Sequence, residues 1–437
     1  MTALPQTSDF DAITRRRMQA GVPRSAKEPI LQICIGIPYT KREQGKAYLN
    51  CSITLGNVER SVYFCVDAEF EKYLCYERAD AFLIGILNIA MRERCDIRCL
   101  SPVTTELLHQ LNTELIPALT KYDSTLYAPR ITAIPDSSTL PCAECVGTGC
   151  SCGIDSLFAI KELTENGTFK PDYVTLNNVG AYTTHSTSSE SLEHYNDNIE
   201  NAQQFAKEHH LPLLVTNSNF ADALPQNHLF IHLYSSAFAI FALRKLWKRY
   251  YYASTGYDLE QNFGLTNNHL HDAAKYDLIA LNAFSIPSLR ICNQGMCTRR
   301  FEKTKVLITY PPAHKYLNVC LNQGKGNCGY CGKCLRTLWT LDALDALEQF
   351  RQVFDIDFYK NNHSEFMYKL CLAHLRGVGM IDEAYDILRP RIPANIQKQA
   401  LTAFRAKKRS TYRKEIYSKL KLRLKRMLHG VKRQSRA

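Results

Sequence analysis

A short run of small and polar residues, Gly149 to Ser156, offers the chain a site for a phosphate group. It follows a strand-like segment and leads into apolar residues from Leu157 onward, so we expect a strand, a loop and then a helix. Free backbone N–H groups in such a loop, together with the positive end of the helix dipole, bind anions. The segment therefore predicts an anion-binding turn.

The side chains of this loop can add to its backbone donors. Ser151 and Ser156 supply hydroxyl groups, Gly153 permits an unusual backbone angle or a close approach, and Asp155 can orient a metal-bound water or cap the helix. The loop lacks the Gly-Lys-Ser/Thr ending of the Walker loop, which excludes that class. A plain turn between strand and helix, capped by Asp155, is the simpler alternative.

Four cysteines form a second candidate site. Cys320, Cys328, Cys331 and Cys334 follow the pattern C-x7-C-x2-C-x2-C, and Gly329 and Gly332 let the chain turn between them. Four thiolates at such a spacing fit a closed, tetrahedral structural zinc site. An iron–sulfur cluster takes the same number of thiolates and is the minor alternative.

A rival set of cysteines precedes the phosphate loop and overlaps it, namely Cys142, Cys145, Cys150 and Cys152. The last two are only one residue apart on the expected strand and loop, which directs their side chains awkwardly. A metal bound there would also obstruct a nucleotide. The sequence therefore favours Cys320 to Cys334 and leaves a second metal open.

The loop resembles the Ser-Gly-Gly-x-Asp-Ser signature of the PP-loop ATP pyrophosphatases, which cleave ATP between the α and β phosphates and form adenylated intermediates. Ser151, Gly153, Asp155 and Ser156 match the signature, whereas Cys152 stands where it has its first glycine. The resemblance implies that ATP contacts the loop from Ser151 to Ser156, including the backbone of Cys152 and Ile154.

The order of the two sites is similar to that of the 7-cyano-7-deazaguanine synthases of this superfamily. Four cysteines and Arg336 follow the loop by some 170 residues, and Lys303-Thr304-Lys305 resembles the Thr-Lys segment of that family. The similarity covers roughly residues 140 to 345. It implies adenylation of a carboxylate with ATP and Mg²⁺, displacement of AMP by ammonia, and a structural Zn²⁺. The chain also has about 140 residues before the loop and about 100 after the cysteines.

Cleavage of ATP in this way develops negative charge that Mg²⁺ and cationic side chains must stabilise. Arg300, Lys303 and Lys305 are the candidates, just before an expected strand from Val306 to Thr309. An ordinary solvated basic patch is the alternative for each of them. Three further residues follow expected strands and are assigned to adenine and ribose: Asn178, Gly180 and Ser254.

The elements that position these residues alternate along the chain. Strands are expected at 173–176, 213–216 and 250–254, with helices at 191–209 and 232–247, which predicts a parallel sheet with crossover helices. Ligands of this α/β architecture lie at the carboxyl ends of the strands. Before the loop, residues 29–65 read as β-rich, and residues 80–91 and 105–119 have helical spacing.

These patterns predict four segments. They are an N-terminal α+β domain at 1–138, an ATP-binding domain with the cysteine loop at 139–345, a helical region at 346–404, and a basic tail at 405–437. The fold class is α/β, of the adenine nucleotide α-hydrolase type that the resemblance implies.

The net charge of +12 belongs to the tail. Residues 405–437 hold 14 of the 54 Lys and Arg residues and one of the 42 acids, so the rest is nearly neutral. Apolar residues recur there every three or four positions, at Ile416, Leu420, Leu424, Met427, Leu428 and Val431. We expect a basic amphipathic helix, which favours an anionic membrane surface over nucleic acid. A solvated basic tail is the plain alternative.

Seventeen cysteines without an export signal or a membrane-spanning run predict a cytoplasmic protein, located peripherally at the inner membrane surface through its tail. The leading hypothesis is an ATP-dependent ligase that adenylates a carboxylate of a small molecule or glycan precursor and joins it to ammonia or another amine. An RNA-modifying enzyme that adenylates a base, and a non-catalytic ATP-binding module, are the alternatives.

Overall fold

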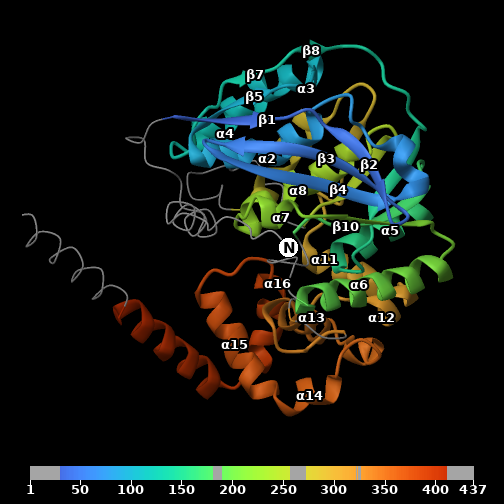
Figure 1. Cartoon of the computed structure of the whole chain (residues 1–437). Coiled ribbons are helices and arrows are strands. Elements are labelled where there is room, and N and C mark those ends of the chain that lie inside the picture. Colours follow the sequence, from blue (N-terminus) through green and yellow to red (C-terminus); the bar gives the residue numbers. More distant parts are fainter. Residues whose placement is uncertain (1–29, 181–188, 256–271, 321, 323–325, 411–437) are drawn as a thin grey trace, which may run out of the picture. The chain divides into compact units, whose positions relative to one another are not determined.

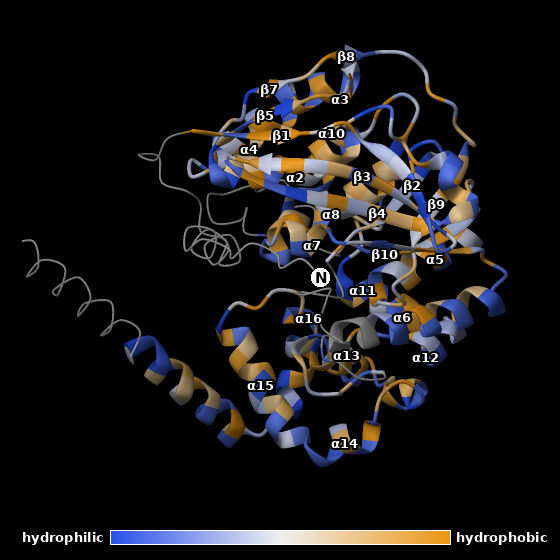
Figure 2. Ribbon diagram, in the orientation of Figure 1, coloured by the Kyte–Doolittle hydropathy of each residue, from blue (hydrophilic) through white to orange (hydrophobic). Residues whose placement is uncertain are grey.

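Apolar residues alternate with polar ones along the N-terminal strands, and this alternation lines one face of a sheet in the computed structural model (Figure 2). β3 (Lys46–Leu55) buries Ala47, Leu49, Cys51 and Ile53, and it pairs antiparallel with β4 (Val58–Asp67) over its whole length. The structure describes residues 30–180, 189–255, 272–320, 322 and 326–410.

Parallel strands carry the predicted phosphate loop. Their order is β13 (Arg290–Gln294), β12 (Trp247–Ala253), β9 (Cys145–Gly149), β10 (Tyr173–Asn178) and β11 (Leu213–Ser218). The strands predicted at 173–176, 213–216 and 250–254 are confirmed, and their parallel pairing is that of crossover connections. Because the strands are parallel, the residues after β9, β10, β11 and β12 share one edge of the sheet.

The N-terminal strands continue the same sheet. β4 pairs antiparallel with the end of β11, and the order then runs through β3 and β1 (Leu31–Ile35) to β5 (Cys95–Cys99) and β7 (Ile131–Thr132). β2 (Tyr39–Glu43) pairs with β3 outside this path. Within the described residues this makes one mixed, mostly parallel sheet of eleven strands. β6 (Val103–Thr104) and β8 (Pro135–Asp136) form a separate pair.

Two almost wholly apolar helices pack beside the strands of the N-terminal part of the sheet (Figure 1). They are α2 (Asp80–Glu93), which is buried along its whole length, and α8 (His228–Ala242), and they form a core of Phe, Ile and Leu side chains. The helix predicted at 232–247 corresponds to α8, which begins four residues earlier than predicted and ends at Ala242.

Two further helices were predicted from apolar spacing. The one at 105–119 is interrupted by a π-helical turn at Leu111–Leu115, between α3 (Thr105–Gln110) and α4 (Ile116–Tyr122). The one at 191–209 is α6 (Ser189–Glu208).

One predicted strand is wrong. The sequence predicts an extended segment at 306–309, but these residues belong to α11 (Arg300–Ile308) and the residue that ends it. The physical reason is the spacing of the buried side chains: Phe301, Thr304 and Leu307 recur every three residues and face the core. That period belongs to a helix, and it outweighs the β-branched residues at its end.

The chain divides into two compact units, residues 1–328 and 329–437. The second is helical, as predicted for the C-terminal region, and its helices are α13 (Gly332–Ala343), α14 (Ile356–Asn361), α15 (His363–Leu375) and α16 (Asp382–Leu388), followed by a helical stretch at 394–410. The division into two units is coarser than the four segments expected from the sequence, which stay a prediction.

Most of the basic tail, residues 411–437, lies outside the described residues, and its membrane-binding role stays a prediction. In the described part of the chain, none of the helices combines the length and apolar character needed to cross a membrane.

A buried ion pair joins the start of α2 to the chain just after α8. Asp80 at the start of α2 accepts hydrogen bonds from the guanidinium of Arg244 and from the backbone N–H of Thr104, at 2.8 Å for the latter. Both charged side chains are at most 3% exposed. Arg244 also donates to the hydroxyl of Thr104, at 2.7 Å. Each charge is therefore compensated only while the other is present.

We expect Asp80→Ala to lower the free energy of unfolding of the first unit by about 3–5 kcal/mol, because it leaves the Arg244 guanidinium buried without its counter-charge. Urea unfolding followed by circular dichroism measures the change. Glu165→Ala is the matched control, since it removes the half-exposed partner of Lys161 on the surface and should cost less than about 1 kcal/mol. Equal losses in the two variants would contradict this role for the pair.

Candidate functional site

The loop between β9 and α5 (Ile154–Glu165) leaves the first turn of that helix without a side-chain cap. Gly153 occupies the N-cap position, and the carboxylate of Asp155 does not turn back to the helix start, which removes the capped-turn alternative. Ser151 is exposed, and its hydroxyl lies 3.1 Å from that of Ser156, which in turn donates to the Gly153 carbonyl. Backbone donors and a hydroxyl thus border the helix start, which suits an anion.

The unusual backbone angle in this loop belongs to Cys152 and not to Gly153. Gly153 has φ −80°, which any residue adopts, whereas Cys152 has φ +55° in the left-handed region. A side chain there costs about 1–2 kcal/mol relative to glycine. Cys152 therefore departs from the PP-loop signature in residue type but keeps the conformation for which a glycine is the ordinary choice.

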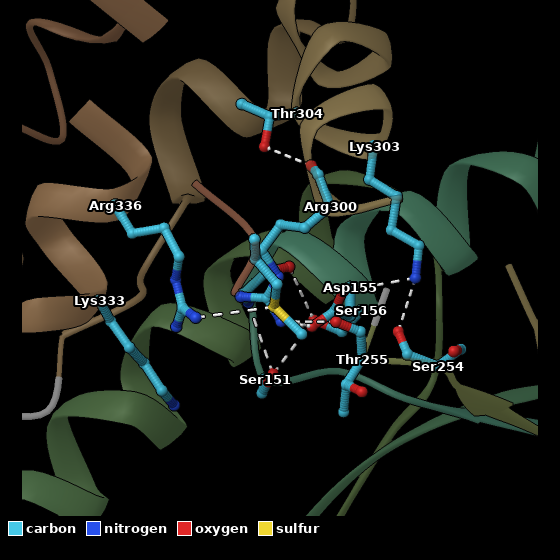
Figure 3. Close-up of polar contacts among 12 residues, drawn as sticks. Ser151, Asp155, Ser156, Ser254, Thr255, Arg300, Lys303, Thr304, Lys333 and Arg336 are labelled. Atoms are coloured by element: carbon cyan, nitrogen blue, oxygen red, sulfur yellow. Dashed lines mark hydrogen bonds and ion pairs between the residues drawn. The ribbon is translucent and has the colours of Figure 1, made fainter. Parts of the chain in front are cut away.

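Two cations from α11 converge on Asp155 (Figure 3). The Arg300 guanidinium donates to one carboxylate oxygen, and the Lys303 ammonium lies 3.4 Å from the other. Lys303 also donates to the carbonyl of Ser254 at 2.6 Å, and Arg300 donates to that of Thr255 at 3.2 Å. Two positive charges on one carboxylate leave a net positive charge beside the helix start, which favours a polyphosphate.

Lys303 is entirely buried, and burial lowers the pKa of its ammonium group against the opposing effect of Asp155. The position of the Lys303 side chain requires the chain after β13 to pass close to it. A Cβ on Gly295, which has φ +77°, would lie 2.8 Å from Phe158 and 3.1 Å from Lys303. Sequence reasoning missed Gly295, although a glycine directly after a strand is a signal for such an approach.

Lys305 is not brought to this site. It lies on α11 two residues after Lys303, about 200° around the helix axis, because each residue of an α-helix turns through about 100°. Its side chain is 61% exposed, and its nearest acid is Glu302 at 3.9 Å. Lys305 therefore lies in a solvated position, as the alternative of an ordinary basic patch expects. Arg300 and Lys303, in contrast, reach Asp155.

A cavity of about 220 Å³ opens at the carboxyl ends of the strands, beside the phosphate loop. Its lining includes Ser151, Asp155 and Ser156 from the loop and helix start, Asn177 from β10, and Tyr252 from β12. Side chains and backbone from several parts of the parallel sheet and its helices thus enclose one space. It is the space that a nucleotide on this loop would enter.

The three residues that the sequence assigns to adenine and ribose have different surroundings at this edge of the sheet. Ser254 is buried and its carbonyl holds Lys303. Asn178 is also buried, and it donates to Asn217 at 2.9 Å, whereas its neighbour Asn177 lines the cavity. Gly180 has φ +105°, and a Cβ there would lie 2.9 Å from Ala221. Their contact with a nucleotide stays a prediction.

The sulfur atoms of Cys320, Cys328, Cys331 and Cys334 lie within 4.8 Å of one another. Asn322 donates its backbone N–H to the sulfur of Cys320 at 3.3 Å and its side-chain amide to that of Cys328 at 3.4 Å. Such N–H donors stabilise thiolates. A set of four sulfur donors fits structural Zn²⁺, which would leave no open position for water.

The cysteine segment touches the phosphate loop through Asn318. The backbone N–H of Asn318 donates to the Cys152 carbonyl at 2.8 Å, and its side-chain oxygen accepts from the backbone N–H of Cys320 at 3.4 Å. The carbonyl of Asn318 also lies 3.7 Å from the position of a Cβ on Gly153. One residue therefore links the backbone of the left-handed Cys152 to the first metal-ligand candidate, and sequence spacing carries no signal of this link.

The rival cysteine set is not brought together in this way. Within the described ranges, the group from Cys320 to Cys334 is the cluster of three or more metal-ligating side chains. Cys150 and Cys152 are fully buried, and a hydrogen bond with Cys150, together with burial, raises the pKa of the Cys152 thiol well above its ordinary value. These two thiols contact each other, and among the described residues no group of three or more metal-ligating side chains includes them.

Comparison with known proteins finds no matching family model, no similar curated protein and no similar solved structure. The fold and the site by themselves define an α/β protein with a large, mostly parallel sheet and a four-cysteine cluster.

We expect the protein purified without chelator to contain about one zinc ion per chain, because four thiolates complete a tetrahedral site. Elemental analysis measures the zinc. Cys331→Ser should lose most of it, whereas Cys297→Ser, which changes an exposed cysteine outside the cluster, should keep it. Iron in place of zinc, or zinc well below one per chain, would contradict the assignment.

The left-handed angle at residue 152 predicts different effects of two substitutions. Cys152→Gly should keep the free energy of unfolding within about 1 kcal/mol, because glycine adopts φ +55° without strain. Cys152→Val should lower it by about 1–2 kcal/mol or more and weaken ATP binding, because a β-branched side chain resists that angle. Urea unfolding and calorimetric titration with ATP measure the two effects. A valine variant as stable as the glycine variant, with equal ATP affinity, would show that the loop does not need this conformation.

Proposed function

We propose that the protein is an ATP-dependent ligase that adenylates a carboxylate, releases pyrophosphate, and then forms a C–N bond with ammonia or another amine. The observation that carries this proposal is the convergence of Arg300 and Lys303 on Asp155 at the open start of α5. The PP-loop resemblance of the same residues supports cleavage between the α and β phosphates. The four-cysteine cluster is consistent with the zinc-containing branch of that superfamily.

The site's own groups suit the departure of pyrophosphate. The uncapped N–H groups of α5 and the hydroxyls of Ser151 and Ser156 would hold the β and γ phosphates. Arg300 and Lys303 would interact with the phosphates as well as with Asp155, and their positive charge would stabilise the negative charge that develops there. Asp155 would then be free to hold Mg²⁺, which prefers one or two carboxylates together with phosphate oxygens and supplies further neutralisation of charge.

The carboxylate that enters is proposed to be a small molecule or a glycan precursor. It would attack the α phosphorus from the cavity beside the loop, where the described residues provide room of about 220 Å³. The positive charge at Arg300 and Lys303 favours an anionic substrate as well as ATP. Adenylation turns the carboxylate oxygen into a good leaving group, and the amine then displaces AMP.

A screen of carboxylates with ATP, Mg²⁺ and ammonia tests the proposal, with pyrophosphate and AMP as readouts. We expect Lys303→Met to reduce pyrophosphate release by about 10²- to 10³-fold, because it removes a buried cation placed to stabilise the developing charge. Lys305→Met is the matched control on the same helix and should stay within about 2-fold of the wild type, because its side chain lies in solvent.

Two outcomes would contradict the proposal. Release of ADP and inorganic phosphate, in place of AMP and pyrophosphate, would exclude adenylation. Equal losses in Lys303→Met and Lys305→Met would show that the contact with Asp155 has no part in the reaction.

A further inference from the structure

A chain of three polar side chains begins in the cavity beside the phosphate loop and leads away from it. Tyr252 of β12 lines the cavity, and its hydroxyl lies 3.3 Å from Nδ1 of His232 on α8. Nε2 of His232 lies 3.1 Å from a carboxylate oxygen of Asp272. Ser236, one helical turn after His232, also lines the cavity, so this part of α8 faces it.

The positions of the three groups are fixed by the fold. Tyr252 shares its strand face with Tyr250, two residues earlier, whose hydroxyl lies 2.5 Å from that of Thr175. Asp272 is held by the backbone N–H of Ala274 at 3.0 Å, as the cap of the short helix η3 (Ala273–Tyr276). The side chains of His232 and Asp272 are 14% and 21% exposed, so both are largely shielded from water yet open to it at one side.

The hydrogen-bond partners define the direction of proton movement. A carboxylate only accepts, so Asp272 selects the His232 tautomer with the proton on Nε2. Nδ1 is then the acceptor, and the Tyr252 hydroxyl donates to it. The oxygen of Tyr252 keeps lone pairs that can accept a proton from a group in the cavity as its own proton passes to His232.

We propose that Tyr252, His232 and Asp272 form the proton relay of the amine step, with Tyr252 as the catalytic residue and the other two acting through it. This inference rests on the proposed ligase function. It assigns to one end of the same cavity the removal of a proton from the attacking amine.

The step balances as follows. Ammonia is mostly protonated near neutral pH, so the relay first takes one proton from ammonium: that proton moves to the Tyr252 oxygen, while the Tyr252 proton moves to Nδ1 of His232. The imidazolium that forms is stabilised by Asp272 and returns its proton to solvent. The freed nitrogen lone pair then forms a bond to the acyl carbon, the C–O bond to AMP breaks with its electron pair leaving on the phosphate, and the second proton passes from nitrogen to water. A nucleophile that is already neutral does not need the first proton transfer.

The test uses the full-length protein, ATP and the carboxylate that gives the most pyrophosphate in the wild-type screen. Exchange of labelled pyrophosphate into ATP without amine reports adenylation alone. Capture of the adenylate by ammonia reports the complete reaction. Capture by hydroxylamine, which is mostly neutral near pH 7, reports attack that needs little help from a base.

We expect Tyr252→Phe to leave exchange within about 2-fold of the wild type and to slow capture of ammonia by about 10²- to 10⁴-fold. Capture of hydroxylamine should fall by less than about 10-fold. Tyr251→Phe is the matched control, because it removes the same hydroxyl from the next residue, whose side chain leaves the strand on the opposite face. It should match the wild type in all three assays.

Two further variants separate proton transfer from a merely structural role. Asp272→Asn should lower kcat for ammonia with an unchanged KM for ATP, and added imidazole should partly restore ammonia capture in His232→Ala. Ammonia capture at the wild-type rate in Tyr252→Phe would overturn the relay, as would losses of exchange and capture by equal factors. If no carboxylate supports exchange in the wild type, adenylation itself fails and the relay fails with it, so the two failures are distinguishable.

Discussion

The burial of Lys303 is the constraint on which the geometry of the site depends. An ammonium group without solvent costs several kcal/mol unless an opposite charge and further hydrogen-bond acceptors compensate it. Asp155 supplies the charge and the Ser254 carbonyl supplies an acceptor. The start of α5, the end of β12 and the first turn of α11 must therefore meet at one point. The adjacency of β9 and β12 in the sheet makes this meeting possible, because it brings the residues after both strands to one edge.

The conformation of the loop from Ser151 to Ser156 is also supported by a contact outside the sheet. Cys152 holds a left-handed backbone angle that is unfavourable for any side chain, so the surrounding structure must maintain it. The hydrogen bond from Asn318 to the Cys152 carbonyl does this from outside the loop, and the same residue accepts a hydrogen bond from Cys320. A metal at the cysteine cluster would therefore restrain the segment that restrains the phosphate loop. Under the proposed function, a structural metal would affect ATP binding without contacting the ATP.

The sequence predicted the parallel strands, the helices after them and the cysteine cluster, because each leaves a local pattern of spacing or residue type. It did not reveal which cation reaches Asp155. Lys303 and Lys305 are chemically equivalent in the sequence, and the wrong assignment of residues 306–309 to a strand hid the helical rotation that separates them. Nor could it reveal the contacts among Tyr252, His232 and Asp272, which are 20 and 40 residues apart. A single histidine in an apolar helix is read as a core residue until its partners are placed.

The charges around Tyr252 explain why a tyrosine here would need His232. Burial, together with the negative charges of Asp277, Asp155 and Asp272, raises the pKa of Tyr252, so its phenol keeps its proton and cannot act as a base by itself. It can only accept a proton while it passes its own to a neighbour. Asp277 adds to this effect from the start of α10 (Asp277–Phe284), where burial raises the pKa of its carboxyl to about 6. Arg300 and Lys303, by contrast, concentrate positive charge at Asp155. Under the proposed function, the cations at Asp155 suit a first step that releases an anion, and the neutral Tyr252, which lines the same cavity and contacts His232, suits a second step that releases a proton.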